Sequence, residues 1–179
     1  MGTLQFNKLL LKTAFSCMAC DGDIDKREIQ LIKRLHKEKK IFGEIDVKLE
    51  MDNLLIAINN DGYMFMKDYF NELTTSNLSE VNELNIIEVA IDTIKADDKV
   101  EYSEIKFFKV IRSKLKIDND QILEKHPDFE DYLEQDIITD SYLSRLQDDF
   151  FDTHISNEFE LISKIDDDIL DSLKEKNEE

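Results

Sequence analysis

A short acidic stretch constrains the fold of this 179-residue chain more than any other feature. Residues 21–28 (DGDIDKRE) follow one run of apolar residues at helical spacing and precede another. A degenerate copy, residues 97–104 (DDKVEYSE), lies 76 positions further along. With only one Pro and four Gly in the whole chain, tight hairpins are disfavoured. The sequence therefore predicts two helix–acidic turn–helix units in an all-α fold.

The helices that precede the two acidic turns align residue by residue. Leu10, Leu11, Ala14 and Met18 correspond to Ile86, Ile87, Ala90 and Ile94. After the second turn, Ile105, Phe108, Ile111 and Leu115 repeat the inner face of the helix that follows the first. We expect helices over about residues 4–20, 25–40, 45–59, 63–73 and 80–95. This pattern is typical of a compact helical bundle built from two pseudo-repeated units.

Local signals place several helix ends. Ser79 is expected to cap the helix that follows it, and Gly43 is expected to stop the helix over residues 25–40. Residues 118–121 (DNDQ) match a capping box that opens a short helix. Pro127 then breaks the chain.

The chain divides into a helical domain over residues 1–125 and an acidic helical C-terminal extension over residues 126–179. From about residue 128 onward, no segment has a counterpart in the first half. Phe159, Ile162, Ile165 and Ile169 recur at helical spacing, which predicts a further helix with an acidic outer face. This extension either packs on the domain or projects from it and docks a partner.

The formal net charge of −18 excludes some partners. Such a surface repels nucleic-acid phosphates and anionic membranes, so we expect neither as a ligand. Divalent cations or a basic protein partner fit the charge better, although solubility alone also accounts for it. No stretch is long and apolar enough to insert directly into a bilayer, and Lys12 interrupts the apolar run near the start. We expect a cytoplasmic protein.

The first acidic stretch matches only the second half of a calcium-binding EF-hand loop. If Asp21 is set as position 5, then Gly22 and Glu28 fall on the turn and on the closing ligand. Cys17 and Ala19 occupy the positions of the first two ligands, and neither is a carboxylate. A full EF-hand pair is therefore excluded.

Two interpretations of the acidic turns stay open. Asp25 and Glu28 have the spacing of a capping box, which needs no ligand. In the second copy Glu101 stands at the N-cap position, with Glu104 three residues later, and Glu is a poor N-cap residue. If the two units pack together, their carboxylates crowd, and a hard divalent cation with oxygen ligands relieves the repulsion. The turns are thus either structural caps or a metal site.

Residues 20–28 (CDGDIDKRE) and 96–104 (ADDKVEYSE) resemble the acidic turns of the TerB-like tellurite-resistance family. The resemblance covers roughly residues 4–125 and departs from the family pattern at Asp98, which replaces Gly. It implies a compact all-helical domain that acts through protein partners, including membrane proteins and components of stress complexes, rather than by catalysis. It also implies a Ca²⁺ or Mg²⁺ site at six carboxylates: Asp21, Asp25, Glu28, Asp97, Glu101 and Glu104.

No other motif points to catalysis. Cys17 and Cys20 offer at most two zinc ligands, and the repeat aligns them with Thr93 and Ala96, which indicates small packing positions. The sequence has no phosphate-binding glycine loop, serine elbow or zinc-protease motif. We therefore expect no enzyme.

The leading interpretation is a TerB-like binding module of a cytoplasmic stress-response or defence complex, with divalent cations at the paired turns. One alternative is a purely structural adaptor whose turns are caps. The other is a metal-dependent hydrolase that uses the clustered carboxylates. The sequence leaves the oligomeric state open.

Overall fold

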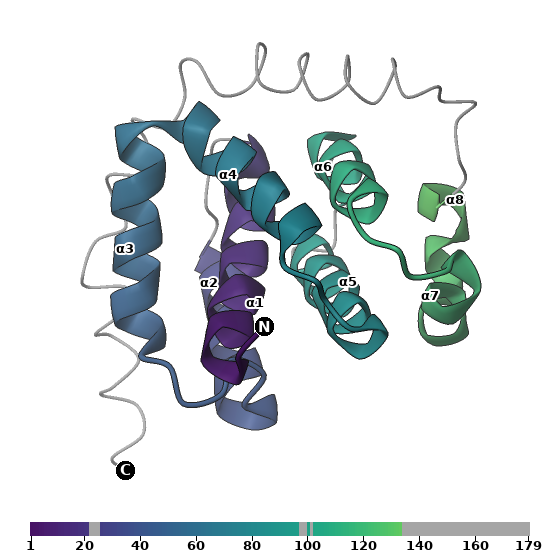
Figure 1. Ribbon diagram of the computed structural model, residues 1–179, viewed down its shortest axis with the longest axis horizontal. Helices are drawn as coiled ribbons and strands as arrows, with labels where there is room; N and C mark the ends of the chain where they lie inside the picture. Colours follow the sequence, from purple (N-terminus) through teal and green to yellow (C-terminus); the bar gives the residue numbers. More distant parts are fainter. Residues whose placement is uncertain (22–25, 97–99, 101, 134–179) are drawn as a thin grey trace.

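A computed structural model of the chain describes residues 1–21, 26–96, 100 and 102–133 (Figure 1), and only the backbone of residues 21, 26 and 27. Within these ranges the chain is all-α, as predicted, and contains no strand. The helices are α1 (Thr3–Met18), α2 (Lys26–Lys39), α3 (Val47–Asn60), α4 (Gly62–Thr75), α5 (Glu80–Ile94), α6 (Tyr102–Ser113), α7 (Asn119–Lys125) and α8 (Glu130–Leu133). Two 3-10 turns, η1 (Ala19–Asp21) and η2 (Pro127–Phe129), follow α1 and precede α8.

The centre of the bundle is the pair of helices α1 and α5, which pack side by side (Figure 1). The positions that the sequence aligns between them, from Leu10 with Ile86 to Met18 with Ile94, are all buried. Each buried Leu or Ile side chain contributes roughly 1.5–3 kcal/mol to folding. The buried faces of α1 and α5 are thus the ones that helical spacing predicts, whereas the internal duplication itself stays a prediction.

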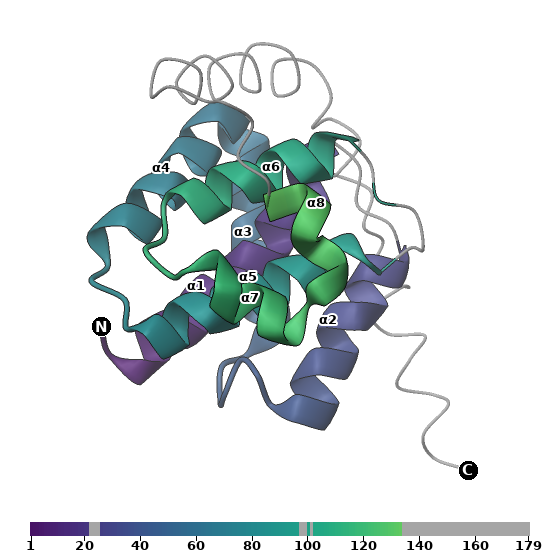
Figure 2. The same ribbon diagram turned by 90° about the vertical axis from the view of Figure 1, so that its right-hand side faces the viewer.

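The other helices surround this pair. On one side, α3 and α4 pack against α1 and against each other, while α2, α6 and α7 pack against α5. Figure 2 shows α7 and α8 lying beside α5 and α6, which they contact. None of the helices in the described ranges combines the length and the apolar character that crossing a bilayer requires.

Aromatic rings join α4 to α6 in the core. The rings of Phe70 and Phe107 lie 5.2 Å apart, and Tyr69 lies 5.4 Å from Phe70. The buried Tyr69 hydroxyl donates to Thr13 Oγ1 on α1 at 3.0 Å. Burial raises the pKa of Tyr69 well above its ordinary value, so the hydroxyl keeps the proton that it donates.

Side-chain caps begin three of the helices. Asp46 accepts from the backbone N–H of Leu49, and Asp61 accepts from that of Met64. Ser79 accepts from the backbone N–H of Asn82 at 3.3 Å, which confirms it as the cap of α5.

Two expected helix boundaries differ in detail. Asp118 does precede α7, but its side chain makes no capping hydrogen bond, so the predicted capping box is not formed. Helix α2 ends at Lys39 because Lys40, and not Gly43, first adopts a left-handed backbone, with φ of 46°. The N–H of Ile41 then donates to the carbonyl of Leu35 at 3.5 Å, six residues back, which closes the helix.

The first residues assigned to the C-terminal extension pack on the domain. The ring of Phe129 is buried and meets Phe108 of α6 edge-on at 5.3 Å. Phe159 and the rest of the apolar stripe that predicts a further helix lie in residues 134–179, outside the described residues.

Candidate metal centre

The element at which the first acidic turn begins packs against the helix that follows the second acidic turn. The 3-10 turn η1, whose last residue is Asp21, extends α1 and packs against α6. Helix α6 is the helix that follows the second acidic turn. The beginning of the first turn therefore lies against the helix that follows the second turn, as expected if the two units pack together.

Glu28 and Glu104 occupy the third position of α2 and of α6, and both side chains are buried, with 8% and 7% exposed. Both carboxylates act electrostatically on the same thiol. Burial, and then the negative charges of Glu104 and Glu28, raise the pKa of Cys17 well above its ordinary value. Each of these two predicted site residues thus carries a negative charge that acts on Cys17, near the end of α1.

The protonation of Cys17 limits the chemistry of this region. A thiol whose pKa is raised stays neutral at physiological pH, so it is a weak nucleophile. Soft metals such as zinc prefer thiolates, whereas Ca²⁺ and Mg²⁺ prefer carboxylate oxygens. The donor groups that remain, Glu28 and Glu104, therefore suit a hard cation.

The same two glutamates also suit a capping role. The third helical position is the one from which a Glu side chain reaches back to the backbone of the N-cap residue. Each of them already interacts with other groups of the chain. Their burial is consistent with a cap and with a cation ligand, so position alone does not separate the two.

The side chains of the other four predicted ligands are not among those that the structure describes. Asp25, Asp97 and Glu101 lie outside the described residues, as does the side chain of Asp21. Among the side chains that the structure describes, no group of three or more His, Cys, Asp or Glu residues is placed to hold a metal. The described part of the candidate centre is therefore a pair of carboxylates.

The cysteines occupy packing positions, as the alignment with Thr93 and Ala96 predicts. Cys17 and Cys20 are buried and form no disulfide. Thr93 is buried as well, and its hydroxyl donates to the carbonyl of Val89 at 2.8 Å.

Sequence reasoning missed a third buried carboxylate, Glu83 of α5. Its Oε2 atom accepts from the backbone N–H groups of Lys116 and Ile117, each at 2.7 Å. These bonds tie the segment between α6 and α7 to α5. The available signal was the position of Glu83, one turn before Ile86 and Ile87 on the face of the helix expected to be buried. A charged residue on a buried face needs a hydrogen-bonding or ionic partner, so a partner for Glu83 could have been expected.

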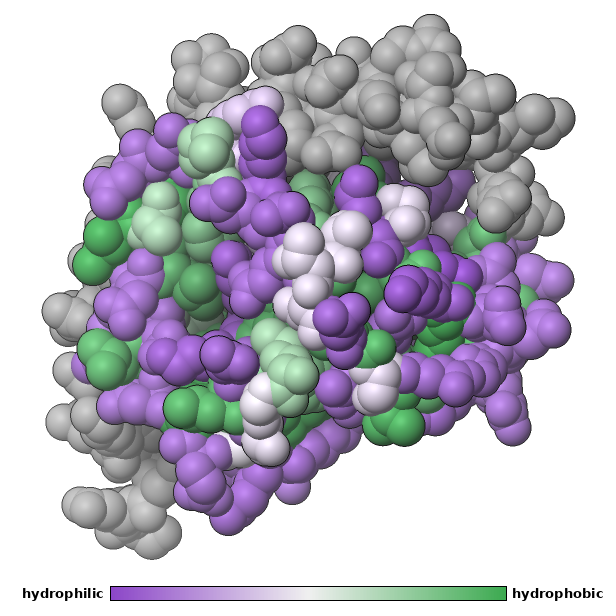
Figure 3. Space-filling model, viewed as in Figure 1, coloured by the Kyte–Doolittle hydropathy of each residue, from purple (hydrophilic) through white to green (hydrophobic). Residues whose placement is uncertain are grey.

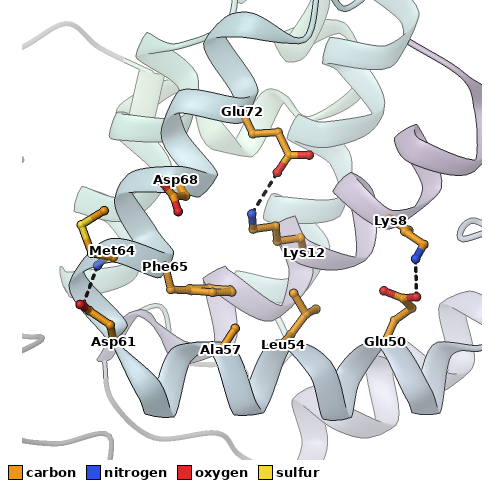
Figure 4. A pocket seen from close by; sticks show the side chains of 10 residues that line it. All are labelled: Lys8, Lys12, Glu50, Leu54, Ala57, Asp61, Met64, Phe65, Asp68 and Glu72. Atoms are coloured by element: carbon orange, nitrogen blue, oxygen red, sulfur yellow. Dashed lines mark hydrogen bonds and ion pairs between the residues drawn. The ribbon is translucent and has the colours of Figure 1, made fainter.

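A second missed feature is a cavity of about 390 Å³ between α1, α3 and α4 (Figure 4). Helix α1 supplies Lys8 and Lys12, and α3 and α4 supply apolar side chains and carboxylates. Neither Glu28 nor Glu104 lines it.

Comparison of the chain with protein-family models, with curated proteins and with solved structures finds no match. The resemblance to the TerB-like family therefore stays a prediction from the two acidic stretches.

Proposed function

We propose that this chain is a TerB-like binding module of a cytoplasmic stress-response or defence complex, which acts through a protein partner and not by catalysis. In this proposal it binds Ca²⁺ or Mg²⁺ at its paired acidic turns. The observation that supports it best is the burial of Glu28 and Glu104 around Cys17, at matching positions of two helices.

In this proposal, repulsion between these two buried carboxylates is what a bound cation relieves. Two negative charges held near one another in a poorly solvated place disfavour the folded state. A hard divalent cation removes that repulsion and takes oxygen ligands, six or more of them for Ca²⁺. Asp21, Asp25, Asp97 and Glu101 supply the further oxygens in this proposal.

Thermal unfolding with and without millimolar CaCl₂ or MgCl₂ tests the cation site. A ligand that binds only the folded state stabilises it, by about 2.7 kcal/mol at a hundred times its dissociation constant. We expect the full chain to melt at a higher temperature with one of these cations, and Glu104→Gln to lose that increase. Glu124→Gln, at an exposed position of α7, is the matched control and keeps it. A wild-type melting temperature that neither cation changes would contradict the proposal.

The second candidate function is a purely structural adaptor, which the third helical position of Glu28 and Glu104 favours. The Gln variants separate the two candidates, because Gln also completes a capping box but is a weaker ligand for Ca²⁺. If the two glutamates are caps, Glu28→Gln and Glu104→Gln are expected to melt at the same temperature as the wild type, both with and without the divalent cation. A cation site predicts variants that the cation no longer stabilises and that, without the cation, are at least as stable as the wild type, because one of the two repelling charges is gone.

A further inference from the structure

The cavity between α1, α3 and α4 has an apolar floor. Leu54 and Ala57 of α3 and Phe65 of α4 line it, and Figure 4 shows Leu54, Phe65 and Lys12 pointing into the space between the three helices. A volume of about 390 Å³ lies within the range of roughly 300–1,000 Å³ that is usual for ligand sites. We call this feature the acidic groove, because of the charges on its rim.

The rim of the acidic groove carries more negative than positive charge. Lys8 pairs with Glu50 at 2.5 Å, and Lys12 pairs with Glu72 at 2.9 Å, so both lysines are neutralised. Asp61 and Asp68 remain, which leaves the lining with two uncompensated negative charges. Asp61 caps α4, and Asp68 is exposed and makes no ion pair within the part of the chain that the structure describes. The rim therefore attracts cations.

The groove already holds one cation against its aromatic wall. Lys12 Nζ lies 5.5 Å from the centroid of the Phe65 ring, a distance at which the face of the ring attracts a positive charge. An incoming Lys or Arg side chain would lie over the apolar side chains of Leu54 and Ala57, with carboxylates on the rim.

Apolar surface continues beyond the groove. Leu49 and Ile56 of α3 are 55% and 60% exposed, Met64 is 42% exposed, and Leu4 of α1, one turn before Lys8, is 61% exposed. Figure 3 shows apolar atoms gathered over α3 and in the hollow beside α4. Exposed apolar side chains near a groove are typical of interaction sites on soluble proteins.

We propose that the acidic groove is the docking site for a basic amphipathic helix of a partner protein. The apolar face of that helix covers Leu54, Ala57 and Met64, and its Lys or Arg side chains meet Asp61 and Asp68. A helix laid in a groove is a recurrent mode of peptide recognition. The argument for a basic partner is charge complementarity.

The same argument disfavours the C-terminal extension of this chain as the occupant. Residues 134–179 contain 15 Asp and Glu against 4 Lys and Arg, which is a net charge of −11. The rim of the groove repels such a segment. The docking proposal rests on the proposed function only in assigning the chain to protein binding, because a chain that binds no cation can still use this groove.

The experiment measures binding of labelled synthetic peptides to the full chain by fluorescence anisotropy at physiological salt. The probe is a helical peptide of about 15 residues with Leu at helical spacing and Lys and Arg elsewhere. A second peptide carries Glu at every Lys and Arg position. We expect the basic peptide to bind and the acidic one not to bind.

Paired variants locate the binding site. Ala57→Trp fills the exposed floor and is expected to lower the affinity at least tenfold, whereas Gln30→Trp, on the exposed side of α2, leaves it unchanged. Asp68→Lys is expected to lower it about fivefold, because an exposed charge pair contributes up to about 1 kcal/mol. Glu124→Lys changes the net charge equally, away from the groove, and is expected to have no effect.

Three results would overturn the docking proposal. The first is equal affinity for the acidic and basic peptides. The second is full binding by Ala57→Trp, which would place the basic peptide elsewhere on this acidic chain. The third is a wild-type dimer that Ala57→Trp dissociates in sedimentation experiments, which would make a second copy the occupant. If the cation site fails, CaCl₂ and MgCl₂ leave the melting temperature unchanged while the basic peptide still binds, so the two proposals fail separately.

Discussion

Helices α5 and α3 are almost equal in length and in apolar content, yet they are buried to very different extents. Each contains eight residues of the Ala, Val, Leu, Ile and Met types. In α5 six of these are buried, whereas in α3 only Met51 and Ile58 are. Among the described helices, α5 packs mainly against α1, α2, α6 and α7, whereas α3 packs mainly against α1 and α4.

This difference shows what apolar content can and cannot indicate. An apolar residue on an enclosed helix adds to stability, whereas the same residue on a helix at the edge stays accessible to a partner. Two apolar side chains of α3 that are not buried, Leu54 and Ala57, line the acidic groove. We therefore assign stability mainly to α1 and α5, and propose partner binding at the edge that α3 forms with α4.

The largest expected effect is on the free energy of unfolding, when one apolar residue of α5 and one of α3 are each replaced by Ala. Ile87→Ala, in the buried face of α5, is expected to lower the free energy of unfolding by about 2–5 kcal/mol, because it leaves a cavity. Ile56→Ala, on the exposed side of α3, is expected to change it by less than about 0.5 kcal/mol. Urea unfolding monitored by circular dichroism measures both. Equal losses would mean that α3 is as enclosed as α5.

The carboxylates of the two helices give the next effect. Glu83→Ala removes the acceptor of two backbone N–H groups, and leaving them unpaired costs about 1–3 kcal/mol. Glu50→Ala breaks only the ion pair of α3 with the half-exposed Lys8, which contributes at most about 1 kcal/mol. The same unfolding curves rank the two variants. A larger loss for Glu50→Ala would reverse the assignment of stability.

The smallest expected effect is a pH dependence centred on Cys17. Its folded-state pKa is raised, so as the pH rises from about 8.5 the unfolded chain loses the thiol proton first and stability falls. Between pH 8.5 and 9.5 the free energy of unfolding is expected to fall by about 1 kcal/mol from this group. Cys17→Ala is expected to remove that part of the slope. Ala57→Ser, in the acidic groove, is expected to keep it, and equal slopes in both variants would contradict the raised pKa.

The helices could be predicted from the sequence because their signals are local. Apolar spacing and the scarcity of Gly and Pro place α1, α4 and α5 to within about two residues. Ser79 was identifiable as a cap from its own residue type. The helix end at the left-handed Lys40 could not be predicted, because Gly43 is the stronger local signal for such a backbone. The hydrogen bond from Ile41 to Leu35 that ends the helix depends on the path of the chain after it.

The candidate site was predictable in part. The repeat pairs Glu28 with Glu104 by sequence alone, and in the structure both are buried and both charges act on Cys17. The cation site itself stays a prediction. That both charges act on Cys17 could not be predicted, since it depends on how α1, α2 and α6 pack. The acidic groove was hidden for the same reason, because no local pattern shows which apolar residues of α3 the other helices leave uncovered.

The most direct test of the cation site is an amide NMR titration of the full chain with CaCl₂ and with MgCl₂. The account predicts saturable shifts at Glu28, Ile29, Glu104 and Ile105 with one of the two cations, and none at Leu54 or Ala57 in the acidic groove. It predicts that Glu104→Gln abolishes the shifts at both helix starts together, because both carboxylates hold the same ion. No shift at either turn at millimolar cation, or independent shifts at the two turns, would contradict a shared cation site.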